Sequence, residues 1–141
     1  FDKVLTAVTS WHPPLCFRKV DEGGARQAVL RQRPVLTTFR LSAPGWERFS
    51  NHFRTVRRSI LTHQDMSPYS SLPGAGSHVD VLISCDSRSL KFLNSWGHDW
   101  GDHGCFRVED YAVLELDEAS GESIVCFYDV YNAAYDLTAE E

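Results

Sequence analysis

The sequence lacks several features that would assign it to a well-defined class of protein. None of its apolar runs approaches the roughly 20 residues that a membrane-spanning helix needs, so we expect no membrane span. Its four cysteines form no C-x-x-C pair, which argues against a zinc knuckle. No internal repeat, low-complexity block or signal peptide is recognisable, and we interpret the first residue, Phe1, as a processing boundary. The compartment and the state of the cysteines stay open.

The composition is that of one globular domain. Hydrophobic residues make up 43% of the 141 residues and aromatic residues 12%, which is more than disordered chains contain. Residues 1–63 carry 11 Lys and Arg against 4 Asp and Glu, a net +7, whereas residues 64–141 carry 3 against 15, a net −12. We interpret this asymmetry as two halves that complement each other when packed. The eight arginines from Arg26 to Arg58 raise the alternative of nucleic-acid binding, but no nucleic-acid motif accompanies them, so a protein partner with an acidic face is the better prediction.

The hydrophobic pattern predicts an α+β chain. Residues 1–20 are expected to be irregular, because His12-Pro13-Pro14 blocks a helix. Helical spacing of apolar residues predicts two short helices, and β-branched or alternating segments separated by turn residues predict strands. The predicted helices are 22–32 and 46–53, the predicted strands are 34–41, 78–85, 89–94, 105–108, 111–116 and 124–131, the loop is 64–77, and the turns are 42–45, 86–88 and 119–122. This order indicates an antiparallel sheet or barrel in the second half.

One predicted hairpin brings two chemically useful side chains together. His78 begins the first strand and Asn94, sixteen residues later, ends the returning strand. The two ends of an antiparallel hairpin lie close together, so the histidine is expected to donate a ring N–H to the asparagine side-chain oxygen. Such a bond fixes the tautomer and orientation of an imidazole, as a general base or an ion-pair partner requires.

The stretch that follows carries a recognisable motif. Asn94-Ser95-Trp96-Gly97, Trp100-Gly101 and Gly104 fit the pattern N-S-W-G-x-x-W-G-x-x-G, and the chain here resembles the papain-like cysteine peptidases. The likeness extends more weakly over residues 22–108, through the helix and strand around Ala28-Val29 and Pro34-Val35. It implies a papain-like fold, of which this chain would be the right-hand half.

The resemblance also implies roles for individual residues. His78 would be the catalytic histidine and Asn94 the residue that orients it. Trp96 would cover their hydrogen bond and exclude water that competes for it, and Trp100 would anchor the loop from beneath. As an imidazolium, His78 would hold a cysteine thiolate and later protonate the leaving amine.

The nucleophile of such a peptidase is missing from the chain. No C-G-[SA]-C-[WY] pattern is present, and only 77 residues precede His78, whereas about 130–150 residues separate the nucleophile from the histidine in papain-like enzymes. Cys16 lies too close to His78 in the sequence, so we interpret it as a structural cysteine. The glutamine of the oxyanion hole is also not recognisable.

Four residues depart from the family pattern. Arg33 stands where a glycine usually precedes the proline, and Ser84-Cys85 stands in place of Gly-Tyr. Asp80 puts a carboxylate in the apolar histidine strand, where burial without a partner would cost about 2–7 kcal/mol. These departures put the local packing in doubt but leave His78 and Asn94 in place.

A metal site is a weaker interpretation. His98, Asp99, Asp102 and His103 have suitable donor atoms, but they occupy the variable positions of the motif, on a loop expected to face solvent. Neither a metal nor a cofactor is therefore expected.

We divide the chain into an irregular segment at 1–21, the C-terminal part of a papain-like peptidase domain at 22–131 and a polar tail at 132–141. The predicted function is to supply His78 and Asn94, with support from Trp96, to thiol-dependent hydrolysis of peptide bonds in a peptide or protein substrate. The cysteine would come from a half outside this chain, and the isolated chain is expected to be inactive. The alternative is a catalytically inactive pseudo-peptidase that acts as an interaction or structural subunit of a larger assembly.

Overall fold

The computed structural model describes residues 1–12, 14–71, 76–115 and 125–133. The helices within these residues are α1 Asp2–Trp11, α2 Glu22–Leu30, α3 Ala43–Thr55 and α4 His63–Met66, with short 3-10 helices at Ser67–Tyr69 and Tyr111–Leu114. The strands are β1 Leu15–Val20, β2 Val35–Leu41, β3 Ile60–Leu61, β4 Gly76–Cys85, β5 Leu90–Leu93, β6 Cys105–Val108 and β7 Cys126–Asn132.

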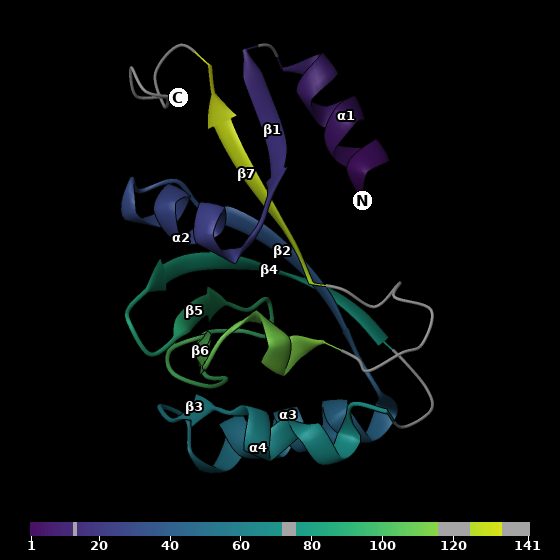
Figure 1. Cartoon of the computed structure of the whole chain (residues 1–141), viewed down its shortest axis with the longest axis vertical. Helices are drawn as coiled ribbons and strands as arrows, with labels where there is room; N and C mark the ends of the chain where they lie inside the picture. The colour runs from purple at the N-terminus through teal and green to yellow at the C-terminus, as the bar shows by residue number, and fades with distance from the viewer. Residues whose placement is uncertain (13, 72–75, 116–124, 134–141) are drawn as a thin grey trace.

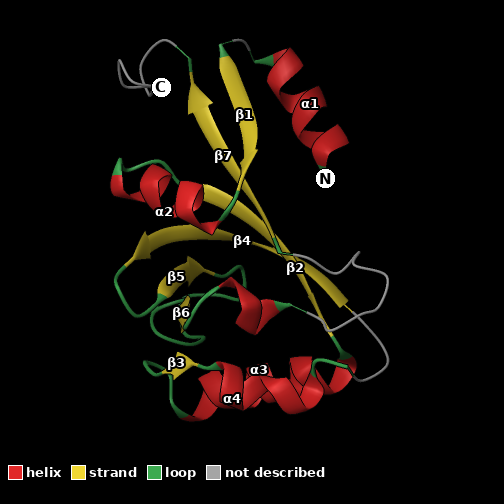
Figure 2. Ribbon diagram, viewed as in Figure 1, coloured by secondary structure: helices red, strands yellow, loops and turns green. Residues whose placement is uncertain are grey.

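These strands form one seven-stranded sheet in the order β1-β7-β2-β4-β5-β6-β3. Its pairings are antiparallel except for that of β3 with β6, which is parallel. Figure 1 shows α1 beside β1 and β7 at one end of the molecule, with α3 and α4 at the other end. The same view coloured by element shows helices and strands interspersed along the chain (Figure 2). The predicted α+β class with a mainly antiparallel sheet is therefore confirmed.

The N-terminal segment is more ordered than the sequence indicated. Residues 1–20 were predicted to be irregular, but they form α1 and β1. The prolines do stop the helix, since α1 ends at Trp11 and β1 begins at Leu15. Their effect is local, and it does not extend to the residues before and after them. Both predicted helices are present, as α2 and α3, and the described residues contain two more, α1 and the four-residue α4.

The strand β2 is central to the sheet and alternates strictly in burial. Val35, Thr37, Phe39 and Leu41 are buried, and the residues between them are half-buried. This period of two places one face of β2 against the hydrophobic core. The prediction of a strand at 34–41 is confirmed, and His78 pairs directly with Phe39 on this strand.

The helix α3 begins three residues earlier than predicted. Ser42 is its N-cap and accepts a hydrogen bond from the backbone N–H of Gly45, and Pro44 lies in the first turn. Both are favoured helix-start residues. The early start adds residues 43–45 to the helix ahead of Trp46.

Two other predicted elements differ from the structure. The strand predicted at 111–116 is instead a 3-10 helix at Tyr111–Leu114, because the Asp110 carboxylate accepts the backbone N–H of Ala112 and caps it. The loop predicted at 64–77 contains most of α4, a 3-10 helix and the start of β4. The predicted turn at 119–122 and most of the polar tail at 132–141 lie outside the described residues.

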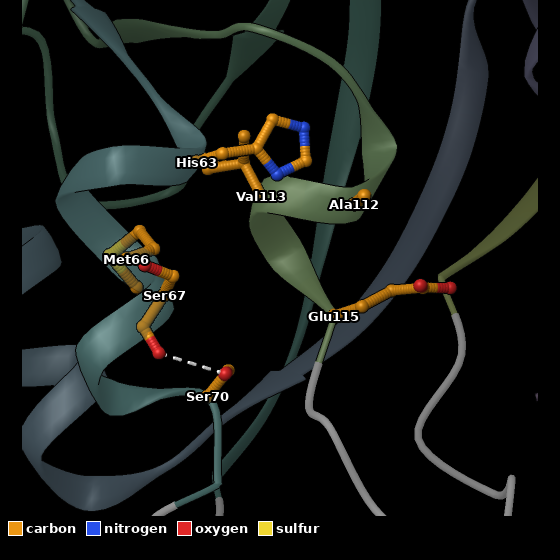
Figure 3. A pocket seen from close by; sticks show the side chains of 7 residues that line it. All are labelled: His63, Met66, Ser67, Ser70, Ala112, Val113 and Glu115. Carbon is orange, nitrogen blue, oxygen red and sulfur yellow. Dashed lines mark hydrogen bonds between the residues drawn. The ribbon is translucent and has the colours of Figure 1, made fainter.

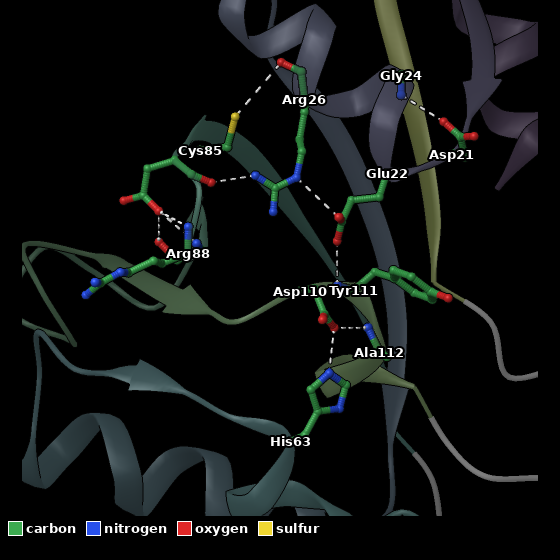
Figure 4. A network of polar contacts seen from close by, with 12 residues as sticks. Asp21, Glu22, Gly24, Arg26, His63, Cys85, Arg88, Asp110, Tyr111 and Ala112 are labelled. Atoms are coloured by element: carbon green, nitrogen blue, oxygen red, sulfur yellow. Dashed lines mark hydrogen bonds and ion pairs between the residues drawn. The ribbon is translucent and has the colours of Figure 1, made fainter.

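A network of polar contacts joins α2 to the far hairpin turn and to the second 3-10 helix (Figure 4). The Glu22 carboxylate accepts the backbone N–H of Tyr111 at 2.8 Å and the Arg26 Nε–H at 3.2 Å. Arg26 also donates to the carbonyl of Asp86 at 2.6 Å, and the Cys85 thiol lies 4.0 Å from the Arg26 carbonyl. These contacts hold the turn between β4 and β5, and so fix the hairpin that carries His78 and Asn94.

None of the helices in the described part of the chain is long and apolar enough to cross a membrane.

Candidate functional site

His78 is the third residue of β4 and lies on the same face of that strand as Asp80 and Leu82. Its neighbour across the ladder is the buried Phe39 of β2, whose ring centroid lies 5.8 Å away in an edge-on arrangement. The His78 side chain keeps 17% of its surface exposed. The imidazole is therefore held in an apolar setting without being closed off from solvent.

Asn94 follows β5 directly and meets His78 across the hairpin. The distance from His78 Nε2 to Asn94 Oδ1 is 2.9 Å, so the structure brings together the two residues that the hairpin argument expected to meet. The same oxygen accepts the backbone N–H of Ser95 at 2.8 Å. Because a backbone N–H can only donate, it fixes which end of the Asn94 amide is oxygen. Nε2 must then carry the proton, and Nδ1 is left as the titrating nitrogen.

The loop after Asn94 is closed by its own backbone. The Asn94 N–H donates to the carbonyl of Gly104 at 2.9 Å, and the Gly104 N–H donates to the carbonyl of Trp100 at 2.8 Å. Gly101 has φ +59°, and a Cβ there would lie 2.6 Å from the carbonyl oxygen of Cys105. The glycine is required at this point because a side chain would collide with backbone.

Two tryptophans contact the His78 ring. Trp96 lies with its ring centroid 5.3 Å from that of His78, although 41% of Trp96 is exposed. Trp46 of α3 lies 5.5 Å away with the two planes at 84°, and its Nε1–H donates to the carbonyl of Gly76 at 2.8 Å. The two indoles and Phe39 therefore surround the imidazole. The family resemblance assigned Trp96 to the site, whereas Trp46 was expected only as the first residue of the predicted helix at 46–53.

Trp100 connects this aromatic group to the core. Its ring stacks on Phe49 of α3 at 6.0 Å and packs edge-on against Phe106 of β6 at 5.8 Å. Trp96 and Trp100 also contact each other edge-on at 5.0 Å. The position beneath the loop is the one that the resemblance implied for Trp100.

Asp80 is the unexpected member of the site. Its side chain is 1% exposed, and its Oδ1 atom lies 3.1 Å from His78 Nε2. Neither carboxylate oxygen accepts a well-aligned hydrogen bond from a described residue, and the Asn94 Nδ2 amide is also without one. Asn94 Oδ1 is the nearer acceptor of the Nε2 proton at 2.9 Å, and the Asp80 carboxylate lies beside the same nitrogen as a negative charge. The sequence suggested no partner for the Asp80 carboxylate, and the structure shows that this partner is His78.

The two groups change each other's protonation. The pKa of His78 is raised above its usual value, chiefly by Asp80, with burial opposing this and Asn94 adding to it. The pKa of Asp80 is also raised, because burial disfavours the carboxylate more than His78 favours it.

A second unusual residue, Arg33, also has a partner. Its guanidinium binds Asp129 of β7 through two hydrogen bonds of 3.0 Å, and Arg18 of β1 reaches the same carboxylate at 3.0 Å. Arg33 and Asp129 are 5% and 1% exposed. The arginine in place of the expected glycine therefore ties the start of β2 to β7.

The residues considered as metal ligands do not converge. The rings of His98 and His103 lie 5.1 Å apart, while Asp102 pairs with Arg58 at 3.5 Å. The described part of the chain contains no group of three or more His, Cys, Asp or Glu side chains that could hold a metal ion.

A separate hollow of about 320 Å³ lies between α4 and the second 3-10 helix. Figure 3 shows His63, Met66 and Glu115 among the side chains that line it. His63 there pairs with Asp110 at 2.8 Å. His78, Asn94 and Trp96 do not line this hollow, so it is distinct from the site.

Comparison with protein-family models finds no match, and comparison with curated proteins finds no significant match. Among solved structures, the chain resembles papain-like cysteine proteases over about four fifths of its length. Xylellain, a cysteine protease from Xylella fastidiosa, is 14% identical over 83% of this chain with a TM-score of 0.49. The bromelain protease from Ananas comosus, solved with the E64 inhibitor, is 18% identical over 81% of this chain with a TM-score of 0.45. The chain spans only 40% and 48% of those proteins.

Proposed function

We propose that this chain is the histidine-bearing part of a papain-like cysteine peptidase, in which His78 and Asn94 serve the thiol-dependent hydrolysis of peptide bonds. The observation that carries the proposal is the 2.9 Å contact from His78 Nε2 to Asn94 Oδ1, with the amide oxygen fixed by Ser95. An imidazole held in this way has one defined tautomer and one free nitrogen, Nδ1. A general acid and base needs both properties.

Each residue would act through a definite atom. The Nδ1 atom of His78 would accept the thiol proton of a cysteine and keep it beside the resulting thiolate as an ion pair. After the thiolate attacks the peptide carbonyl, the same proton would pass to the leaving amine. Asn94 would keep the ring in position throughout, and Trp96 would limit the access of water to the hydrogen bond between them.

The cysteine of this reaction would come from outside the chain. Cys16 lies in β1, which β7 and β2 separate from β4 in the sheet, and its sulfur contacts the Pro14 carbonyl. Cys85 is at the opposite end of β4 from His78 and points to Arg26. Cys105 is buried at the start of β6, and Cys126 begins β7. None of these thiols has a described contact with His78.

A second function is favoured by one observation. Asp80 already gives the His78 imidazolium a counter-charge 3.1 Å away, so the site is electrostatically balanced without a thiolate. That arrangement suits a catalytically inactive pseudo-peptidase that binds another protein as a subunit of a larger assembly. In either case the partner is a protein or peptide: a substrate for the enzyme, or another subunit for the pseudo-peptidase.

The test is the activity of the full-length product of the gene that encodes this chain. The enzyme proposal expects turnover of a fluorogenic peptide that is blocked by a thiol-alkylating reagent, abolished by His78→Ala and unchanged by His12→Ala, which alters an exposed histidine in another part of the fold. The isolated 141-residue chain should be inactive. A full-length product without a reactive cysteine and without turnover would refute the enzyme and leave the pseudo-peptidase.

A further inference from the structure

The position of Asp80 gives it access to His78 and to little else. Residues two apart on a strand share a face, so Asp80 lies beside His78 on β4. Its side chain is 1% exposed, and its Oδ1 atom is 3.1 Å from His78 Nε2. Both carboxylate oxygens lack a well-aligned hydrogen-bond donor among the described residues. A carboxylate buried in this way is costly unless an opposite charge balances it.

The other groups around the ring cannot supply that charge. The strand β2 presents Phe39, and the helix α3 presents Trp46. The loop presents Asn94 and Trp96. All four are uncharged side chains, so within the described residues the electrostatic environment of His78 is set by Asp80.

We propose that Asp80 is a positioning residue for His78: its carboxylate is the counter-ion that keeps the ring charged at Nδ1 while the Nε2 proton stays between Asn94 and Asp80. The proposal rests on the function proposed above and adds a residue to it. Asn94 determines the orientation of the ring, because its oxygen is the nearer acceptor and is itself fixed by Ser95. Asp80 determines the charge of the ring, because an opposite charge within about 4–6 Å favours the ionised form.

The charge of Asp80 would affect the proton transfer between a cysteine and His78. Because Asp80 favours the charged ring, Nδ1 would take up the proton of an incoming thiol more readily, and the resulting pair of imidazolium and thiolate would be stabilised. The raised pKa of His78, for which Asp80 is the largest cause, agrees with this arrangement. The unfavourable part of this arrangement is the burial of the Asp80 carboxylate, which raises the pKa of Asp80.

The test is the titration of His78 in the isolated chain, followed by NMR of ¹⁵N-labelled histidine. Asp80→Asn removes the charge and keeps the shape of the side chain, and it is expected to lower the midpoint of the His78 titration by about one pH unit or more. The matched control is Asp99→Asn, which removes the same charge from an exposed position in the loop. It should leave the midpoint within about 0.2 pH units. An unchanged midpoint in Asp80→Asn, or equal shifts in both variants, would overturn the proposal.

A second measurement needs no variant and covers the case in which Asp80→Asn does not fold. In the wild-type chain, the ¹³C shift of the Asp80 side-chain carboxyl should show an inflection at the midpoint of the His78 titration, because the two charges are coupled. The absence of that inflection would also overturn the proposal. Neither measurement uses a thiol or a substrate, so a failure here leaves the peptidase proposal standing, and an inactive full-length protein leaves the role of Asp80 standing.

Discussion

Trp46 and His78 lie edge to face, with ring centroids 5.5 Å apart and planes at 84°. The indole N–H of Trp46 is bound to the carbonyl of Gly76, two residues before the histidine. The first turns of α3 are thus connected to the beginning of β4 by one side chain. Trp46 therefore supports the position of the imidazole from α3.

Replacing this tryptophan should affect both stability and the site. We expect Trp46→Ala to lower the free energy of unfolding by about 3 kcal/mol, because it removes a large packed ring and its hydrogen bond. Trp46→Phe should lose less and keep the aromatic contact with His78. Chemical denaturation measures both. The control is Trp11→Ala, which alters a tryptophan that is 73% exposed and should change stability by less than about 0.5 kcal/mol. Similar losses for Trp46 and Trp11 would show that the contact is unimportant.

Asn94→Ala should remove the acceptor of two hydrogen bonds. The His78 ring and the Ser95 N–H both lose their partner, and an unsatisfied buried donor costs about 1–3 kcal/mol. We expect a loss of unfolding free energy of that size in urea denaturation. Asn51→Ala, at an exposed position on α3, is the matched control and should lie within about 0.5 kcal/mol of the wild type. A neutral Asn94→Ala variant would mean that the amide does not hold the ring in solution.

The burial of the ion pair between Arg33 and Asp129 predicts that substitution of Arg33 lowers stability more than substitution of Arg18 does. Arg33→Met should cost about 3 kcal/mol or more, since both partners are buried and the Asp129 carboxylate would keep the hydrogen bonds from the more exposed Arg18 to its Oδ2 atom but lose both of those from Arg33. Arg18→Met should cost about 1 kcal/mol, because its side chain is 37% exposed and Asp129 keeps both bonds to Arg33. Thermal denaturation of the two variants compares them. A larger loss for Arg18→Met would contradict the assigned geometry.

The buried His52 is expected to cause part of the loss of folding stability at acid pH. It is buried on α3, and its Nε2 lies 2.9 Å from the Ser59 hydroxyl. Burial, the largest cause, lowers the pKa of His52 below its ordinary value of 6.5. The folded state then binds this proton less readily than the unfolded chain does. The stability that neutral His52 contributes is complete above pH 6.5 and is lost as the pH falls through the lowered pKa.

His52→Gln can keep a hydrogen bond to Ser59 but cannot take up the proton. We therefore expect this variant to lose less stability than the wild type between about pH 7.5 and pH 5, as measured by the urea midpoint. His12→Gln, at an exposed histidine, should follow the wild type. Parallel curves for the wild type and His52→Gln would contradict the assignment. His78 acts in the opposite direction: its raised pKa gives stability that is present below pH 6.5 and lost as the pH rises through that raised value.

The meeting of His78 and Asn94 could be predicted from the sequence because hairpin geometry is local. A strand that starts at the histidine, a short turn and a strand that ends at the asparagine bring the ends together with few alternatives. The strand β2 could be predicted for the same reason, since Val35 to Leu41 are rich in β-branched and aromatic residues within one short segment.

Other features depend on contacts between distant segments and could not be predicted from the sequence. Nothing in the sequence places Trp46 against His78, because the packing of α3 on the sheet determines that contact. Arg33 and Asp129 are 96 residues apart, and no local pattern links them. The strand propensity of residues 111–114 was overridden by the cap at Asp110, a signal that an aspartate before a short apolar run could have supplied.

Asp80 was recognised as unusual but not explained. The sequence showed a carboxylate in an apolar strand, and the same-face rule for residues two apart would have placed it beside His78. The structure supplies the distance, 3.1 Å, that makes the carboxylate a partner of the histidine.

The most direct test of the account is the tautomer of His78 in the isolated wild-type chain, read from long-range ¹H–¹⁵N NMR correlations above the pH at which the ring loses its charge. The proton is expected to remain on Nε2, donated to Asn94 Oδ1 beside the Asp80 carboxylate, with Nδ1 as the bare nitrogen. A proton on Nδ1, or the mixture of tautomers shown by a freely exposed histidine, would contradict it.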